Sequence, residues 1–274
     1  MLNAVRSSLP FVSSPAPVVP VVRLEGMIGR GGRGSRTLSL AGIEAALDRA
    51  FKTKHAPAVA LAINSPGGSP VQSRLIHDRL RALAETHEKR VFAFCEDLAA
   101  SGGYMIALGA DEIWVDPSSI VGSIGVVGAM FGVHEAIAKI GVERRVYTAG
   151  ANKVRLDPFR PEKPEDVVWV ESLQRDLHAE FIDLVKARRG LKLKDGEEPL
   201  FEGDVWLGRR AKELGLIDDV GHLREVLRER YGEGVRFKRI APAKPPLLAR
   251  FLNAGADAAF EVVEERLAWG RFGL

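Results

Sequence analysis

Short apolar runs alternate along the first half of the chain with longer segments in which apolar residues recur every three or four positions. The short runs have the length and composition of buried strands, and the longer segments have the periodicity of amphipathic helices. This alternation is typical of an α/β protein built from βαβ units. The predicted strands are 19–28, 58–63, 90–94 and 112–115, and the predicted helices are 40–51, 71–84 and a run that begins at 104.

The second half of the chain is richer in helical pattern. Segment 164–187 begins with a proline, which is favoured in the first turn of a helix, and is predicted as one long helix. A proline-rich break at 241–246 precedes a final amphipathic segment, which we expect to pack on its own body or on another subunit because its polar side is acidic. The other predicted elements are helices 131–140, 203–214, 223–231 and 247–269, and strands 142–147 and 235–240.

Composition narrows the possible functions. The 274 residues are 46% hydrophobic and 27% charged, as in an ordinary soluble globular protein. The net charge of +3 is small and spread along the chain, so no nucleic-acid partner is expected. The single cysteine, Cys95, excludes a disulfide framework and is expected to be a partly buried strand thiol. No Cys–His cluster, HExxH motif or phosphate loop occurs, so we expect no metal and no other cofactor.

The N-terminal segment contains one arginine followed by prolines and serines, and no uninterrupted apolar stretch reaches half the length of a membrane span. We therefore expect neither a signal peptide nor a transmembrane anchor. The expected location is the cytoplasm of a bacterial-type cell, with any membrane contact peripheral and without a direct span.

A serine between small residues stands where a predicted helix begins, in Ala-Ala-Ser-Gly-Gly-Tyr at 99–104. At that place the oxygen of Ser101 would face free backbone N–H groups and the positive end of the helix dipole, which suits a nucleophile. The same position suits an ordinary helix cap, and from the residue alone the cap is the favoured reading.

A pair of glycines follows the second predicted strand, in the sequence INSPGG at 63–68. Glycines there allow a backbone geometry that other residues avoid, and they let a substrate carbonyl approach N–H groups. Gly68 and Gly102 could then offer two donors to a developing oxyanion. A plain tight turn is an equally good interpretation of the same residues.

A serine nucleophile needs a base. The stretch 120–127 after the serine helix contains no histidine, and the next one downstream is His134, which argues against a Ser-His-Asp triad. Lysine can serve as the base if its ammonium group loses its water shell. Lys153 is a candidate, although most lysines are solvated surface charges.

Taken together and in this order, INSPGGS, LAASGGYMIALGAD, VGSIGV, ANKVRLDPFRP and GDVWLGRRAKELGLIDDVG resemble the signal peptide peptidase A (SppA) family of serine peptidases. The resemblance covers roughly residues 20–240. INSPGG and AASGG alone are also similar to the ClpP protease, but ClpP-like chains carry a histidine in the stretch that matches 123–125. Many SppA relatives carry an N-terminal membrane anchor, so this chain resembles the short soluble members.

The resemblance implies a ClpP/crotonase-type fold with βαβ units, two roughly perpendicular sheets and a helical C-terminal part. It also implies Ser101 as nucleophile, Lys153 as general base, and Gly68 and Gly102 as oxyanion donors. In the family the dyad is assembled between neighbouring subunits of a homo-oligomeric ring. The implied domains are a flexible tail at 1–19, a peptidase domain at 20–240, and a proline-rich break with an amphipathic helix at 241–274.

The predicted function is therefore a serine endopeptidase that cleaves signal-peptide-like or unstructured polypeptides through a Ser–Lys dyad and an acyl-enzyme. Ser123, in the glycine-rich run, is either a support for the lysine or a simple turn residue. Two alternatives use the same residues differently. One is a crotonase-type acyl-CoA enzyme with the same oxyanion hole, and the other is a catalytically inactive peptide-binding scaffold.

Overall fold

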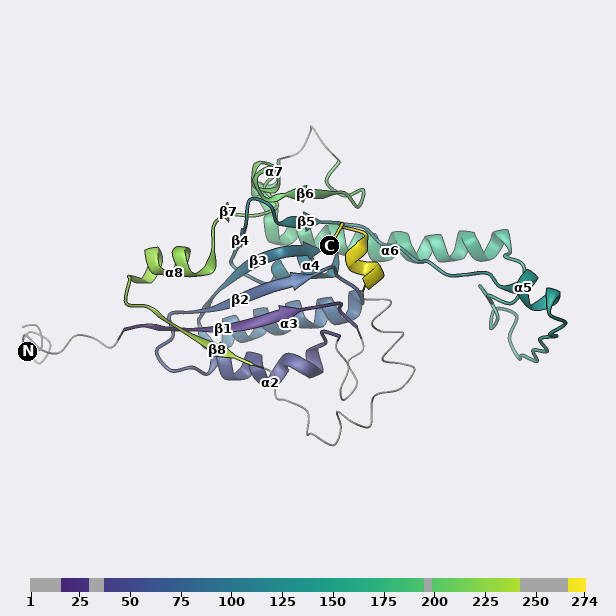
Figure 1. Cartoon of the computed structure of the whole chain (residues 1–274), viewed down its shortest axis with the longest axis horizontal. Helices are drawn as coiled ribbons and strands as arrows, with labels where there is room; N and C mark the ends of the chain where they lie inside the picture. The colour runs from purple at the N-terminus through teal and green to yellow at the C-terminus, as the bar shows by residue number, and fades with distance from the viewer. Residues whose placement is uncertain (1–15, 30–36, 195–198, 242–265) are drawn as a thin grey trace, which may run out of the picture.

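The computed structural model describes residues 16–29, 37–194, 199–241 and 266–274, and its centre is a mostly parallel sheet (Figure 1). β2 is buried along its whole length, which explains its continuous apolar sequence: helices cover both faces of the sheet beside it. The strands are β1 Val18–Glu25, β2 Ala58–Ser65, β3 Arg90–Ala100, β4 Glu112–Val115, β5 Ile120–Gly122, β6 Val205–Leu207, β7 Asp219–Val220 and β8 Arg236–Ile240.

The sheet has the order β6-β5-β3-β2-β1-β8 and branches at β3. The first half of β3 pairs with β4, which pairs in turn with β7, and its last three residues pair with β5. The pairing with β2 shifts register between these halves, and Asn64 fills the irregularity by accepting a hydrogen bond from the Leu98 N–H at 3.0 Å. The α/β class is confirmed, and the expected second sheet is a branch hydrogen-bonded to the first.

Two helical layers close the core. The larger core lies between the sheet and α2, α3, α4 and α6, and the smaller one lies under α8 on the opposite face. The helices are α2 Leu40–Phe51, α3 Pro70–His87, α4 Gly102–Ala107, α5 His134–Lys139, α6 Pro164–Arg189, α7 Gly208–Glu213 and α8 Leu223–Tyr231, with a 3₁₀ turn at Gly190–Lys192.

An arm extends from this body, formed by α5, its flanking segments and the first half of α6 (Figure 1). α6 has 26 residues and is therefore about 39 Å long. Its second half buries Phe181, Leu184 and Val185 in the core. Arg188, near the C-terminal end of α6, donates to the carbonyls of Leu108 and Ala110 at 2.7 and 2.8 Å. These bonds hold this half of the helix beside the end of α4.

Several sequence-based boundaries differ from the structure. Segment 142–147 is not a strand, because it lies in the arm without a neighbouring strand to pair with. The predicted helix at 203–214 begins instead as β6, which pairs with β5, and only its second half is helical. β1 starts at Val18, inside the predicted tail, whose residues 1–15 lie outside the described residues. Most of the predicted helix 247–269 also lies outside them, and residues 266–270 are helical.

Candidate active site

Ser101 stands at the junction of β3 and α4 in an unusual backbone conformation. Its φ of 52° and ψ of −120° lie in a region that L-residues rarely occupy, and such strain gathers at functional sites. Its N–H donates to the Gly122 carbonyl at 2.8 Å, and its carbonyl accepts from the Met105 N–H at 3.0 Å. Its side chain makes no capping hydrogen bond, so the helix-cap interpretation of Ser101 is wrong.

The glycine turn after β2 lies directly against Ser101. Gly67 has a φ of 100°, and a Cβ added there would stand 2.8 Å from the Cβ of Ser101. Gly68 has a φ of 138°, and a Cβ there would overlap the carbonyl oxygen of Ile28. Only glycine fits both positions, because the backbone is left-handed and the neighbouring chain is in contact.

Two backbone N–H groups beside Ser101 are left without an acceptor within the part of the chain that the structure describes. They belong to Gly68 and Gly102, whereas the N–H groups of Gly67 and Ser69 donate to Ser65 Oγ and to the Ile28 carbonyl. Unpaired N–H groups next to a nucleophile can bind an anionic tetrahedral oxygen. The structure thus brings together three of the sequence-predicted residues: Ser101, Gly68 and Gly102.

Ser123 directly follows β5, as Ser101 directly follows the paired strand β3. The pairing of Ala100 with Gly122 places Ser123 level with Ser101 on the neighbouring chain segment. Ser123 also has a positive φ, of 52°, and its N–H donates to the Asp204 carbonyl at 2.7 Å. Its backbone is therefore fixed, and the residue is half-buried.

One histidine that the sequence analysis missed reaches the same segment from α6. Nε2 of His178 lies 3.1 Å from the carbonyl oxygen of Ile124. A carbonyl only accepts, so this nitrogen carries a proton in that contact and cannot take one from Ser101. No local motif marks His178, because its approach depends on how α6 packs.

Lys153 is not near Ser101 within one chain. Lys153 is exposed and belongs to the segment that joins α5 to α6. Figure 1 shows this segment in the arm, whereas α4 lies in the body. Among the hydrogen bonds and ion pairs of the described residues, none joins Ser101 to Lys153. The predicted pair is therefore separated in the isolated protomer.

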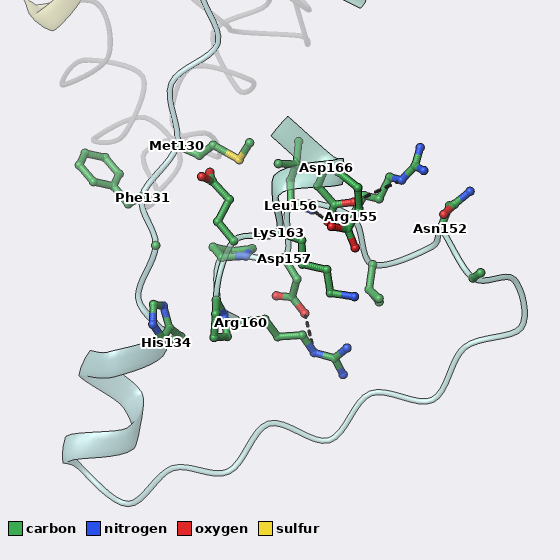
Figure 2. Close-up of a pocket in the computed structure, with 17 residues that line it drawn as sticks. Met130, Phe131, His134, Asn152, Arg155, Leu156, Asp157, Arg160, Lys163 and Asp166 are labelled. Atoms are coloured by element: carbon green, nitrogen blue, oxygen red, sulfur yellow. Dashed lines mark hydrogen bonds and ion pairs between the residues drawn. The ribbon is translucent and has the colours of Figure 1, made fainter. Parts of the chain in front are cut away.

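The segment that carries Lys153 is held by two carboxylates beside a cavity of about 350 Å³ in the arm (Figure 2). Asp166 lies 3.3 Å from Nε of Arg155 and accepts from the Leu156 N–H at 3.3 Å. Asp157, whose side chain is only 3% exposed, pairs with Arg144 at 3.2 Å. Asn152 and Val154, on either side of Lys153, both line this cavity.

Other reactive groups are unsuited to catalysis. Burial raises the pKa of the Cys95 thiol to about 12, so it stays protonated and unreactive at neutral pH. Of the side chains that the structure describes, no group of three His, Cys, Asp or Glu could hold a metal ion.

Of the described helices, none combines the length and apolar character that a membrane crossing requires.

The chain is similar in sequence and in fold to known proteases. The profile of Peptidase family S49 matches residues 84–233. A putative protease of Synechocystis sp. is 31% identical over 212 residues, which are 77% of this chain and 73% of that protein. A solved structure of a mutant of the 1510-N membrane-bound stomatin-specific protease has a TM-score of 0.51 at 17% identity, and the match covers 83% of this chain and 99% of that one.

A longer relative is more similar in sequence. A Brucella abortus (strain 2308) protein named Na(+)/H(+) antiporter NhaA is 54% identical in a 272-position alignment that covers 93% of this chain. The chain spans 37% of the length of that relative, so the name describes a much longer protein.

The branched parallel sheet belongs to an α/β fold of the ClpP/crotonase type. The chain belongs to peptidase family S49, a family of serine peptidases that includes SppA and protease 4.

Proposed function

We propose that this protein is a serine endopeptidase in which Ser101 is the nucleophile and Lys153 is the general base. The observation that carries the proposal is the environment of Ser101. Its backbone is strained, its side chain makes no capping hydrogen bond, and the unpaired N–H groups of Gly68 and Gly102 lie beside it. A serine that served structure alone would gain stability from a relaxed backbone and a capping bond, and Ser101 has neither.

The chemistry follows from these positions. The neutral amine of Lys153 removes the proton of Ser101 as its Oγ attacks a peptide carbonyl carbon. The N–H groups of Gly68 and Gly102 bind the resulting oxyanion, and each such donor contributes about 3 kcal/mol to transition-state stabilisation. The protonated Lys153 then gives its proton to the leaving amine, and an acyl-enzyme forms. Water, deprotonated by the same amine, attacks the ester and releases the second product.

The dyad is proposed to form between subunits of a homo-oligomeric ring, because Lys153 lies in the arm. The arm exposes large apolar side chains to solvent. Phe131 and Tyr147 are 87% and 91% exposed, and Trp169, Leu173 and Leu177 of α6 are also exposed. Such a surface is typical of a protein interface. A neighbour that covers this surface would also remove water from Lys153, and a lysine general base requires such a dry environment.

Ser123 is proposed to orient the incoming Lys153 by a hydrogen bond. Its level position beside Ser101 and its fixed backbone support this role. The substrates proposed are signal-peptide-like or unstructured polypeptides, which can enter beside the glycine-rich segment 122–128 in extended form.

The test is hydrolysis of an unstructured peptide pool by full-length protein, with products mapped by mass spectrometry. Ser101→Ala and Lys153→Ala should each abolish cleavage, while the size of the assembly stays that of the wild type. His178→Gln is the matched control for a histidine base and should keep most of the activity. Full activity in Ser101→Ala, or loss of activity in His178→Gln alone, contradicts the assignment.

Mixing the two inactive variants tests the sharing of the site. Mixed assemblies would contain some interfaces with an intact Ser101 and an intact Lys153, so part of the activity should return. If subunits exchange, as labelled protomers would show, and no activity returns, the dyad is not shared between protomers.

A further inference from the structure

Ser65 is the last residue of β2, and its side chain is completely buried. A buried hydroxyl is costly unless it is paired, so its partners identify what it holds in place. Ser65 Oγ donates to the carbonyl of Gly26 at 2.7 Å and accepts from the N–H of Gly67 at 3.2 Å. The hydroxyl therefore connects the end of β1 to the glycine turn.

Those two segments together determine where the N–H of Gly68 points. Residues 26–29 run parallel to the turn: the Ile28 N–H donates to the Gly67 carbonyl at 2.7 Å, and the Ser69 N–H donates to the Ile28 carbonyl at 2.8 Å. Gly68 lies between these two bonds, with its own N–H unpaired among the described residues. Through its bonds to Gly26 and Gly67, Ser65 Oγ links residues 26–29 to the glycine turn at the point where the two segments begin to pair.

Ser65 also supports the serine side of the site. A Cβ placed on Gly103, in the first turn of α4, would stand 2.6 Å from the carbonyl oxygen of Ser65 and 3.2 Å from its Cβ. The turn that carries Gly68 and the helix that follows Ser101 thus rest on the same buried residue.

We propose that Ser65 is a positioning residue that holds the Gly68 N–H in the direction of the transition-state oxygen. The inference rests on the proposed peptidase function and deepens it. Ser65 is buried and touches no substrate, so it acts only through the geometry of the turn. Loss of its hydroxyl should therefore weaken binding of the transition state and leave binding of the peptide ground state unchanged.

The experiment compares Ser65→Ala with the wild type in full-length assembled protein. We expect kcat to fall by roughly 10- to 100-fold with KM changed less than about 2-fold, since a small displacement of a catalytic group has effects of that size. Affinity for a peptide aldehyde, which forms a tetrahedral adduct with Ser101, should fall in parallel with kcat/KM, while affinity for the corresponding peptide alcohol should not change.

Ser119→Ala is the matched control. Ser119 is also buried, donates to a backbone carbonyl and accepts from the Asp116 N–H at 2.9 Å. Its loss should lower stability similarly and leave the ratio of aldehyde to alcohol affinity at the wild-type value. Ser65→Cys keeps the volume with a weaker donor, should show a smaller kcat loss, and supplies the measurement if Ser65→Ala does not fold.

The outcomes are distinguishable from failure of the proposed function. Cleavage that persists in Ser101→Ala removes the peptidase assignment itself. If Ser101→Ala is inactive but Ser65→Ala and Ser65→Cys match the wild type in kcat, only the positioning role is wrong. Equal losses of aldehyde and alcohol affinity in the Ser65 variants would also overturn it, because they would indicate general loosening.

Discussion

Ser101 holds its position beside the glycine turn at the cost of backbone strain. A non-glycine residue at its φ and ψ costs on the order of 1–3 kcal/mol, and the surrounding hydrogen bonds to Gly122 and Met105 maintain it. The sequence predicts the serine and the glycines around it, because only small residues fit where chains approach closely. It does not predict the strain, which arises from the pairing of β3 with β5.

The strain gives a stability prediction that is independent of activity. Ser101→Gly should be more stable than Ser101→Ala by about 1 kcal/mol, because glycine occupies a positive φ without a steric penalty. Denaturant unfolding of the two inactive variants measures this difference. Gly234→Ala is a control at a position without positive φ and without a close neighbour, where alanine should be tolerated. An alanine variant at position 101 as stable as the glycine variant would show that the site is not strained.

At the scale of elements, the hydrophobic pattern predicts those helices and strands whose formation depends on local interactions. Most strands and helices of the βαβ units match their predicted ranges, because each buries an apolar face of its own, but β3 continues to Ala100, beyond its predicted end at 94. Segment 142–147 has a strand-like pattern but no neighbouring strand, and β6 lies inside a helical pattern because β5 offers it an edge. Whether 142–147 and β6 become strands depends on pairing with a distant segment, and the pattern of a single sequence does not show which distant segments pair.

The arm gives a prediction for the element that carries Lys153, the proposed general base. Asp157→Asn keeps the acceptor for the Phe159 N–H but removes the charge that holds Arg144 and Arg160. The segment with Lys153 should loosen, and kcat should fall by roughly 3- to 10-fold, because a base held less firmly is less often in place. The denaturant midpoint of the body should stay at the wild-type value, since the ion pairs of Asp157 lie within the arm.

Glu143→Gln is the matched control for that prediction. Glu143 pairs with Arg145 at 2.7 Å in the same arm, but both side chains are about 70% exposed, so the pair contributes little. Its removal should leave kcat unchanged. Equal effects of the two substitutions would show that the arm responds to net charge and not to the buried carboxylate.

At the scale of the whole molecule, the proposed site is divided between body and arm. The sequence predicts Ser101, Gly68 and Gly102, which lie together in the body, and Lys153, which lies apart from them in the arm. Spacing along a chain carries no information on distances between protomers, so the separation of Lys153 from Ser101 followed only from the course of the arm. Ser65 escaped notice for a related reason: its partner Gly26 is distant in sequence.

Two histidines make the stability of the whole molecule depend on pH in opposite directions. Burial lowers the pKa of His77, and Arg188 and Arg74 nearby lower it further, while Asp78, 2.8 Å from Nδ1, raises it by less. Nε2 of His77 has no hydrogen-bond partner among the described residues. Hydrogen bonds to Asp116 and Glu225 raise the pKa of His222. His77 is therefore neutral when the protein is folded at neutral pH, whereas His222 binds its proton more tightly when folded.

The signs of these shifts give the expected pH profile. Below about pH 6.5 the unfolded chain takes up a proton that His77 resists, so stability should fall as the pH drops from there towards the lowered pKa. The contribution of His222 is complete below about pH 6.5 and is lost as the pH rises through its raised pKa. Denaturant unfolding between pH 5 and 8 should therefore show His77→Gln flattening only the acid side and His222→Asn only the alkaline side. An acid side unchanged in His77→Gln would mean that other groups cause the loss.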